Sequence, residues 1–379
     1  DLHLVNFDND SVGYYKEKIV ALDTTNVKNI HDAAQFLLEN LAQYDKAEKY
    51  YRLALRQSLA QHGEAHEEVA ESYGALANLY CYKSQYGIAK EYFEKSISIQ
   101  TNLSGEKHKR VAEAYIGIGF ICSSMMAFHE GLAYYQKADN ILKKVCGEKE
   151  PDLVPLYINM AGSCQILGKN QEAYDYYQKA LKLQMEIAGE NTILTAKLFH
   201  NIASYYEGMK NLDKACEYYQ KAMEIRLKVV GSWHPEIASS YFAIGCLLDS
   251  GGKYDEAIEC LSKSLAISLD LNGFYSSEVA NTLSKIANIY YGQAKYQESE
   301  EYFLQALKSG IQVYGPDHLI VYGNYLALAN AYKHQEKYAQ AIEYFQNALN
   351  VLIHTKGEND PDADLYRRVI KELGKKINK

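Results

Sequence analysis

The feature that most constrains the fold is a glycine that recurs every 42 residues along the chain. The series is Gly63, Gly105, Gly147, Gly189, Gly231, Gly273, Gly315 and Gly357. Only 24 of the 379 residues are glycine, so chance does not produce this unbroken series. A fixed period of this length indicates a repeat architecture, in which each unit buries its apolar face against its neighbours. The length therefore predicts one elongated array of about nine periods rather than two or three compact domains.

Each period also contains the pattern of two helices. One helix carries small residues seven positions apart, two turns along the same face, as in Ala47 and Ala54. The helix before it carries apolar and small residues at spacings of three, four and seven, as in Tyr73, Leu76 and Ala77. We call these the second and the first helix of a repeat. Because the connections between them are short, the two helices should pack antiparallel.

The buried face of each first helix starts with one position that we call the aromatic slot. It is occupied by Tyr73, Tyr115, Tyr157, Phe199, Tyr241, Leu283 and Tyr325. Most of the 35 tyrosines recur at this position and at others that pack between helices. The repeat phase therefore predicts core packing for these rings, in preference to a nucleobase-stacking surface.

These residues resemble the tetratricopeptide repeat. The family's consensus positions are matched in order by Tyr73, Leu76, Ala77, Tyr80, Ala89, Phe93 and Ser96. The resemblance covers about residues 44–357, and the 42-residue unit resembles the kinesin light chain variety of the family. It implies an all-α fold, a right-handed superhelical solenoid of antiparallel helix pairs, and a noncatalytic role in protein binding.

The repeat phase also predicts the organisation of the chain. Residues 1–27 form an N-terminal extension, 28–62 a degenerate opening repeat, 63–357 seven repeats, and 358–379 a C-terminal capping helix. The opening repeat has His31 in its aromatic slot, and the terminal helix, expected over residues 365–377, has Arg367 there. A polar terminal helix is what a solenoid needs to cover its last apolar face.

Composition excludes several classes of partner. The formal net charge is −8, which opposes binding to a phosphate backbone, so we expect no nucleic-acid partner. The longest weakly polar stretch, residues 112–128, is interrupted by Glu113 and is too short for a membrane span, so we expect no membrane contact. Seven dispersed cysteines without C-x-x-C spacing predict reduced thiols and a cytoplasmic location. Self-association through the ends of the array stays possible.

No catalytic or metal-binding pattern is present in the sequence. His66, His108, His234 and His318 each follow the periodic glycine by three residues, just before a first helix. Because equivalent residues of successive units lie too far apart to share one metal, a loop or capping role is predicted. Gly117 and Gly119 occupy the helix-packing phase, and no strand precedes them as a nucleotide loop requires. We therefore expect no enzyme activity, no cofactor and no metal.

The family resemblance places the binding surface on the first helices, at the positions one, two and five residues after the aromatic slot. The candidate groove residues are Asn78, Ile116, Phe120, Ile158, Asn159, His200, Asn201, Phe242, Lys285, Asn288, Leu326 and Asn330. The asparagines suit a peptide backbone, because an amide both donates and accepts hydrogen bonds. The apolar members could instead contact a neighbouring unit. Kinesin light chains carry an Asn-Asn pair in each first helix, whereas this chain has single asparagines at Asn159 and Asn201.

Two functions are expected for this chain. The first is a scaffold that binds a peptide or a partner segment in the concave groove. The alternative is a regulatory or sensor arm of a larger enzyme whose catalytic domain lies outside these residues, because the chain begins at Asp1 rather than Met.

Overall fold

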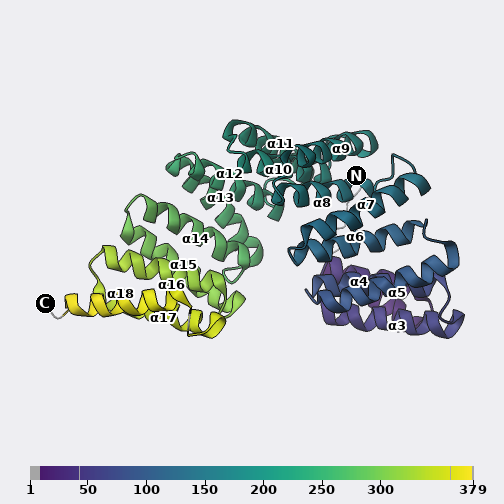
Figure 1. Ribbon diagram of the computed structural model, residues 1–379, viewed down its shortest axis with the longest axis horizontal. Helices are drawn as coiled ribbons and strands as arrows, with labels where there is room; N and C mark the ends of the chain where they lie inside the picture. The colour runs from purple at the N-terminus through teal and green to yellow at the C-terminus, as the bar shows by residue number, and fades with distance from the viewer. Residues whose placement is uncertain (1–8, 42, 359, 378–379) are drawn as a thin grey trace. The chain divides into compact units, whose positions relative to one another are not determined.

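The computed structural model describes residues 9–41, 43–358 and 360–377, which form 18 α-helices and no strand (Figure 1). The helices are α1 (Asn9–Leu22), α2 (Val27–Glu39), α3 (Tyr44–His62), α4 (Glu67–Tyr82), α5 (Tyr86–Ser104), α6 (Lys109–Ser124), α7 (Phe128–Val145), α8 (Leu153–Ile166), α9 (Asn170–Ala188), α10 (Ile193–Gly208), α11 (Leu212–Val230), α12 (Pro235–Ser250), α13 (Tyr254–Asn272), α14 (Ser277–Gly292), α15 (Tyr296–Tyr314), α16 (Leu319–His334), α17 (Tyr338–Lys356) and α18 (Pro361–Ile377). The predicted all-α class is confirmed.

The predicted helix pairs are present in every repeat. The most extensive contacts join α2 with α3, α4 with α5, and so on to α16 with α17. Within each of the seven pairs from α4–α5 to α16–α17, the chain reverses through one residue in the left-handed region. These residues are Ser84, Met126, Gly168, Lys210, Gly252, Ala294 and Glu336, with φ between 56° and 75°. The next amide then reaches back across the turn, as Gln85 N does to Tyr80 O at 2.9 Å, in a Schellman closure.

The periodic glycines end the second helices. All eight have positive φ, between 74° and 94°. At Gly273 the pair φ 74°, ψ 175° lies in a region that is essentially restricted to glycine. A Cβ atom at any of the eight would meet nothing within 4 Å. Backbone conformation, and not lack of space, therefore requires this glycine.

Tyrosine rings fill the space between the two helices of a repeat. Tyr92 of α5 stacks on both Tyr73 and Tyr80 of α4, at centroid distances of 5.8 and 5.6 Å. The same arrangement recurs where Tyr344 of α17 packs on Tyr325 and Tyr332 of α16. These contacts confirm the packing role predicted for the slot tyrosines.

Small residues admit the close approach of neighbouring helices. Ala47 and Ala54 of α3 are fully buried, as are Ala215 and Ala222 of α11. At Gly117 an added Cβ would overlap the Phe93 ring. Gly119 has the same relation to Tyr135, whose ring would lie 2.6 Å from an added Cβ. Both glycines serve helix packing, as predicted.

Histidines begin several first helices. The Nδ1 atoms of His66, His108, His234 and His318 accept hydrogen bonds from the backbone N–H two residues later, at 3.2 to 3.3 Å. A side chain in this position satisfies one of the amide groups that a helix start leaves free. The predicted capping role is confirmed for all four.

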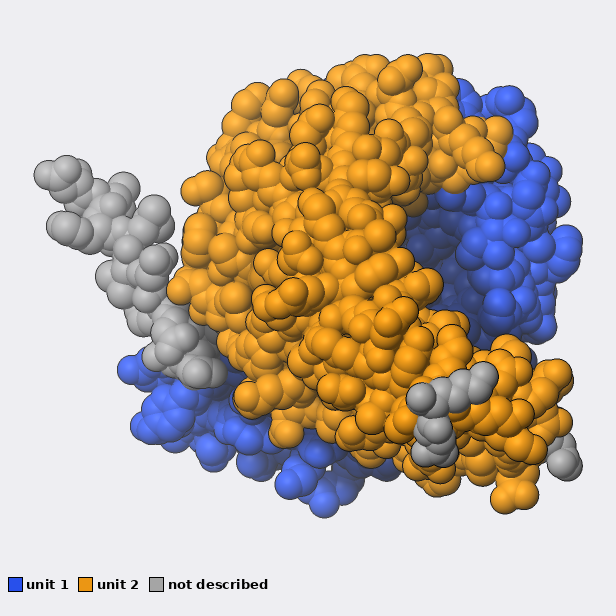
Figure 2. Space-filling view, turned by 90° about the vertical axis from the view of Figure 1, so that its left-hand side faces the viewer, with its two compact units in different colours: residues 1–188 blue, residues 189–379 orange. Residues whose placement is uncertain are grey.

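The chain divides into two compact units, residues 1–188 and residues 189–379 (Figure 2). Unit 1 holds α1 to α9 and unit 2 holds α10 to α18. In unit 1 the first helices contact one another across repeats, α4 with α6 and α6 with α8. In unit 2, α12 contacts α14 and α14 contacts α16. No second helices of neighbouring repeats make comparable contacts in the described residues, so the first helices form the tighter layer of each unit.

The N-terminal end is more ordered than its description as an extension suggested. Within the extension predicted over residues 1–27, residues 9–22 form α1, which packs on α2 beside Phe36 and Leu41. Residues 1–8 of the extension lie outside the described residues. In the opening repeat, His31 takes the aromatic slot and its ring lies 5.6 Å from that of Tyr51.

The C-terminal helix α18 starts at Pro361, four residues earlier than the sequence pattern indicates. Tyr366 is its buried aromatic residue, and the Tyr366 hydroxyl lies 2.6 Å from that of Tyr322. Arg367, in the aromatic slot, is exposed and pairs with Asp364 at 2.9 Å. Residues 359 and 378–379 of the predicted capping segment lie outside the described residues.

Candidate functional site

The predicted groove positions are the uncovered positions of the first helices. Residues one, two and five after the aromatic slot are half-buried or exposed in all seven repeats. Residues three and four after it are buried, apart from the half-buried Ile244. The first helices therefore leave these positions at least partly accessible, although Ala75, Phe242, Leu326 and Ala327 also pack against the core. Binding by the twelve candidate residues stays a prediction.

Unit 1 contains a groove of about 800 Å³ between α2, α4 and α6. We call it the unit 1 groove. Its floor is formed by Tyr51 of α3 and Phe93 of α5, which reach between the first helices. Gly74, Ala75 and the candidate residue Asn78 line it from α4. Small residues at the first two of these positions leave the room that a larger side chain would occupy.

Charged side chains surround this floor. The carboxylates of the lining are Asp32, Glu39, Glu68, Glu71 and Glu113, and the cations are Lys28 and Arg110. The His31 imidazole adds no positive charge to this lining near pH 7, because burial holds its pKa below the usual value. Its Nε2 lies 2.9 Å from Ser72 Oγ, while that hydroxyl donates to the Glu68 carbonyl at 2.9 Å. Nε2 is therefore the protonated nitrogen, since the hydroxyl has one hydrogen.

Unit 2 contains a groove of about 480 Å³ between α12, α14 and α16, which we call the unit 2 groove. It collects the candidate residues Phe242, Lys285 and Asn288, with Phe303 of α15 in its lining. A second cavity of about 350 Å³ also includes Phe242 and extends toward α13. The structure thus brings three of the twelve candidates together in one groove.

The asparagines use part of their hydrogen-bonding capacity on their own helices. Asn288 Nδ2 donates to the Ser284 carbonyl at 2.8 Å, and Asn330 Nδ2 donates to the Leu326 carbonyl at 2.9 Å. These bonds orient each amide and leave its oxygen and second N–H for another molecule. The two side chains therefore present donor and acceptor groups in a defined direction.

Asn324 is a groove residue that the sequence pattern missed. It is only 4% exposed and lines the unit 2 groove. Ser284 Oγ lies 3.0 Å from its Oδ1, whereas its Nδ2 is buried without a hydrogen bond in the described structure. The available signal was weak, because the position immediately before the aromatic slot also carries Ser72, Ser240 and Thr282, and only the amide of Asn324 sets it apart.

Two of the charged or titratable candidates are held by the protein itself. Burial opposes the charge of Lys285, but Nζ lies 2.7 Å from Asp249 Oδ2, and this carboxylate raises the pKa of Lys285. His200 packs edge-on against Tyr219, with ring centroids 5.0 Å apart. Burial lowers its pKa to about 4, with a further contribution from Arg226. His200 is therefore neutral near pH 7 and serves packing at least as much as binding.

The remaining candidates occupy uncovered helix positions. Phe120 is 44% exposed on α6. The others are half-buried: Ile116, Ile158, Asn159, Asn201 and Leu326. Since apolar side chains left partly exposed at repeated positions can bind a partner or merely border the core, burial alone does not separate the two roles.

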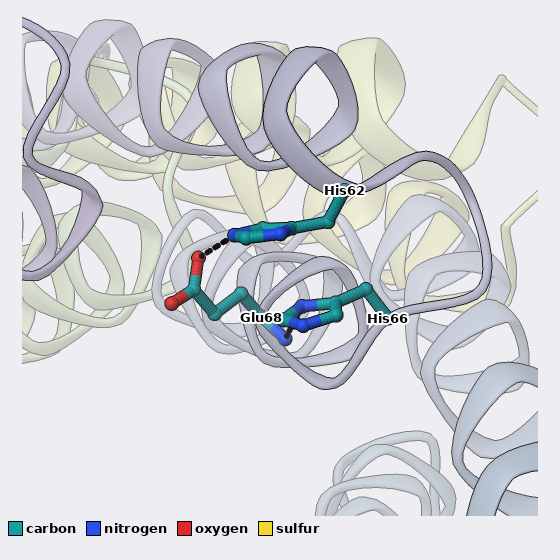
Figure 3. Close-up of side chains that lie close together, drawn as sticks. All are labelled: His62, His66 and Glu68. Atoms are coloured by element: carbon teal, nitrogen blue, oxygen red, sulfur yellow. Dashed lines mark hydrogen bonds and ion pairs between the residues drawn. The ribbon is translucent and has the colours of Figure 1, made fainter.

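A histidine cluster at the edge of the unit 1 groove, which Glu68 also lines, escaped the sequence interpretation. His62, His66 and Glu68 converge where α3 ends and α4 begins, with His62 Nε2 3.4 Å from Glu68 Oε2 (Figure 3). The two imidazole rings stack at 3.9 Å with planes 13° apart. Nitrogen lone pairs lie in the ring planes, so those of nearly parallel rings do not meet at one metal ion, which would need about 2.0–2.1 Å to each nitrogen.

The same stack occurs elsewhere without a second histidine. Tyr314 stacks on the capping residue His318 at 4.6 Å, one turn before a first helix. Positions 62 and 314 are equivalent in the repeat. Ring stacking on a capping histidine therefore explains the cluster as it stands.

The family model described as tetratricopeptide repeat matches residues 29–102, 110–186, 152–210, 194–270 and 278–353. The chain belongs to the tetratricopeptide repeat family. The resemblance read from Tyr73 to Ser96 is thereby confirmed, and the repeats account for the grooves between their first helices. Among the described helices, none has the length and apolar character that a membrane crossing requires. A comparison with curated proteins finds no match.

Several solved structures are similar to this chain. A Rap protein complexed with competence and sporulation factor is 16% identical, with 94% of this chain and 99% of that chain covered and a TM-score of 0.58. The apo quorum sensor NprR from B. thuringiensis is 16% identical, with 92% and 98% covered and a TM-score of 0.57. A putative kinesin light chain from Podosopora anserina is 19% identical, with 55% and 98% covered and a TM-score of 0.48.

Proposed function

We propose that this tetratricopeptide array is a noncatalytic binding protein that holds an extended peptide or partner segment against its first helices. One observation carries the proposal. The positions one, two and five after the aromatic slot stay half-buried or exposed in every repeat, and several of them line grooves in both units. Partly accessible side chains at the same place in each repeat suit a ligand that runs from repeat to repeat.

Two asparagines on the first helices of unit 2 support a peptide backbone as ligand. Asn288 and Asn330 are oriented by their own helices and keep one donor and one acceptor each. Phe242 lines the unit 2 groove together with Asn288 and adds an apolar contact there. The Rap structure, whose fold is similar, was solved with competence and sporulation factor bound, which is consistent with ligand binding by such arrays.

The proposed location is a reducing compartment, the cytoplasm. All seven cysteines are free thiols, and burial raises the pKa of Cys81 and Cys246 to about 11, which keeps both protonated. Self-association through the ends of the array stays an untested prediction.

A displayed library of random 12-residue peptides, selected on the full chain, tests the proposal. Asn288→Ala combined with Asn330→Ala should weaken the selected peptides at least tenfold in a fluorescence polarisation titration. The matched control is Gln305→Ala, since Gln305 makes the same amide bond to the carbonyl four residues earlier on the second helix α15. The thermal midpoint should stay within about 2 °C for both, because these side chains are exposed or half-buried and lie outside the buried core.

Two results would contradict this function. The first is a selection that yields no peptide. The second is a set of peptides that bind the double variant and the Gln305→Ala control as tightly as the unchanged chain.

A further inference from the structure

The unit 1 groove has an excess of negative charge. Five carboxylates line it against two cations, and its histidine is neutral. These carboxylates come from three successive first helices: Asp32 and Glu39 from α2, Glu68 and Glu71 from α4, and Glu113 from α6. Because they face one concave space rather than open solvent, their fields add within it.

The protein's own cations neutralise little of this charge. Arg110 pairs with Glu67 through Nε and with Glu71 through Nη2, both at 3.0 Å. It is therefore engaged at the edge of the groove. Neither Asp32 nor Glu113 forms an ion pair with any side chain that the structure describes. Lys28 is exposed near the start of α2.

Glu113 is a carboxylate that loses part of its hydration because it lies in the groove. Its side chain is exposed, yet the walls of the groove displace enough water to raise its pKa above the usual value, and Arg110 offsets this only in part. A carboxylate that water still reaches but does not fully surround gains more from an incoming cation than one on a convex surface does.

The floor suits the rest of a long basic side chain. Tyr51 and Phe93 close the bottom of the groove, and Tyr82 is 56% exposed at its side. Gly74 leaves space above the floor, since an added Cβ would meet only Ser96 Oγ, at 3.7 Å. Lysine and arginine carry their charge on apolar stems, which pack on aromatic surfaces while the charged end stays polar.

The unit 2 groove has the opposite character. Its lining contains no carboxylate among the described residues, and Lys285 is its one charged member there. Asp249 already pairs with that lysine at 2.7 Å. A basic side chain finds no partner in this groove, so the two units present different chemistry.

We propose that the unit 1 groove binds a protein segment through a lysine or arginine side chain, whose charged end enters the acidic lining to which Asp32 and Glu113 contribute carboxylates unpaired among the described residues, and whose stem lies over the aromatic floor. This inference rests on the proposed peptide-binding function and names the chemistry that one of its grooves recognises. The segment is extended, because the groove crosses three repeats, and apolar residues beside the basic one contact Ala75 and Tyr82.

The same random 12-residue library tests the inference. Peptides selected on the full chain should carry lysine or arginine at one aligned position. Replacing that residue with citrulline, which keeps the shape of arginine without its charge, should weaken binding at least tenfold. Raising NaCl from 50 to 300 mM should also weaken the arginine peptide and leave the citrulline peptide little changed.

The variant pair Asp32→Asn with Glu113→Gln should lower the affinity for the arginine peptide at least tenfold and abolish its preference over citrulline. The control pair is Asp213→Asn with Glu224→Gln, two exposed carboxylates of the second helix α11 that change the net charge equally. Equal losses in both pairs would mean that overall charge, and not the groove, attracts the peptide, and would overturn the inference.

Failure of the inference differs from failure of the proposed function. Selected peptides that depend on Asn288 and Asn330 but carry no aligned basic residue would overturn the basic-segment assignment and leave the peptide-binding function standing. A selection without any binding peptide would overturn both.

Discussion

Replacing Gly273 with alanine tests why glycine recurs every 42 residues. Gly273 follows α13 with φ 74° and ψ 175°, and a Cβ atom there would meet nothing within 4 Å. Steric overlap with other residues therefore contributes nothing to the cost. What remains is the backbone conformation itself, which an L-residue adopts only at a penalty.

The size of the penalty follows from the region of φ and ψ. A non-glycine residue in this region costs about 1–3 kcal/mol. Alanine also lowers the conformational entropy of the unfolded chain, and this stabilises the folded state by about 0.4–1 kcal/mol. We expect Gly273→Ala to lower the free energy of unfolding by about 1–2 kcal/mol. Gly273→Asn should cost as much, because asparagine tolerates the left-handed helical region at ψ near 45° but not ψ near 175°.

Urea unfolding followed by far-ultraviolet circular dichroism measures this change, with attention to the slope because arrays can unfold in segments. The matched control is Gly323→Ala. Gly323 lies within α16, and an added Cβ there also meets nothing within 4 Å. This variant should gain about 0.5–1 kcal/mol from helix propensity. Unchanged stability in Gly273→Ala, or recovery in Gly273→Asn, would refute the conformational explanation.

Two further predictions concern other backbone and titration effects. Ala294 lies at φ 58° in the turn between α14 and α15, so Ala294→Gly should raise the free energy of unfolding by about 0.5–1 kcal/mol in the same urea assay, and a loss would contradict it. His200 has a pKa near 4 when folded, because of burial, and about 6.5 when unfolded, so the unfolded chain binds more protons between these values. Stability should therefore fall as pH drops from 6.5 toward 4. The variant His200→Phe, which copies Phe242 at the equivalent position, should show a weaker pH dependence of the thermal midpoint across that range. An equal slope in both proteins would exclude His200 as its source.

The sequence predicted the repeat core well because its determinants are local. Glycine at the end of a second helix and small residues two turns apart indicate backbone conformation and helix faces directly. The left-handed turn residues escaped notice because only Gly168 and Gly252 among the seven are glycine. The closure of each helix pair holds residues such as Met126 and Ala294 in a conformation that their own preferences oppose.

The candidate site was predicted less completely. The uncovered positions follow from the repeat phase, and so does their place on the first helices. Asn324 lies on the buried side of that phase, yet it reaches the unit 2 groove. The ion pair between Lys285 and Asp249 joins residues 36 positions apart, and no spacing in the sequence predicts it.

The sequence alone therefore determined the period, the helix pairs and the family, because each depends on conformational preferences that act within one 42-residue unit. Tertiary structure decided which side chains share a space. Asp32 and Glu113 lie 81 positions apart in the sequence and line one groove, because the groove spans the first helices of three repeats. Phe93 occupies the volume left by Gly117. Charge and shape in a groove are properties of stacked repeats, and they exist only once neighbouring units have packed.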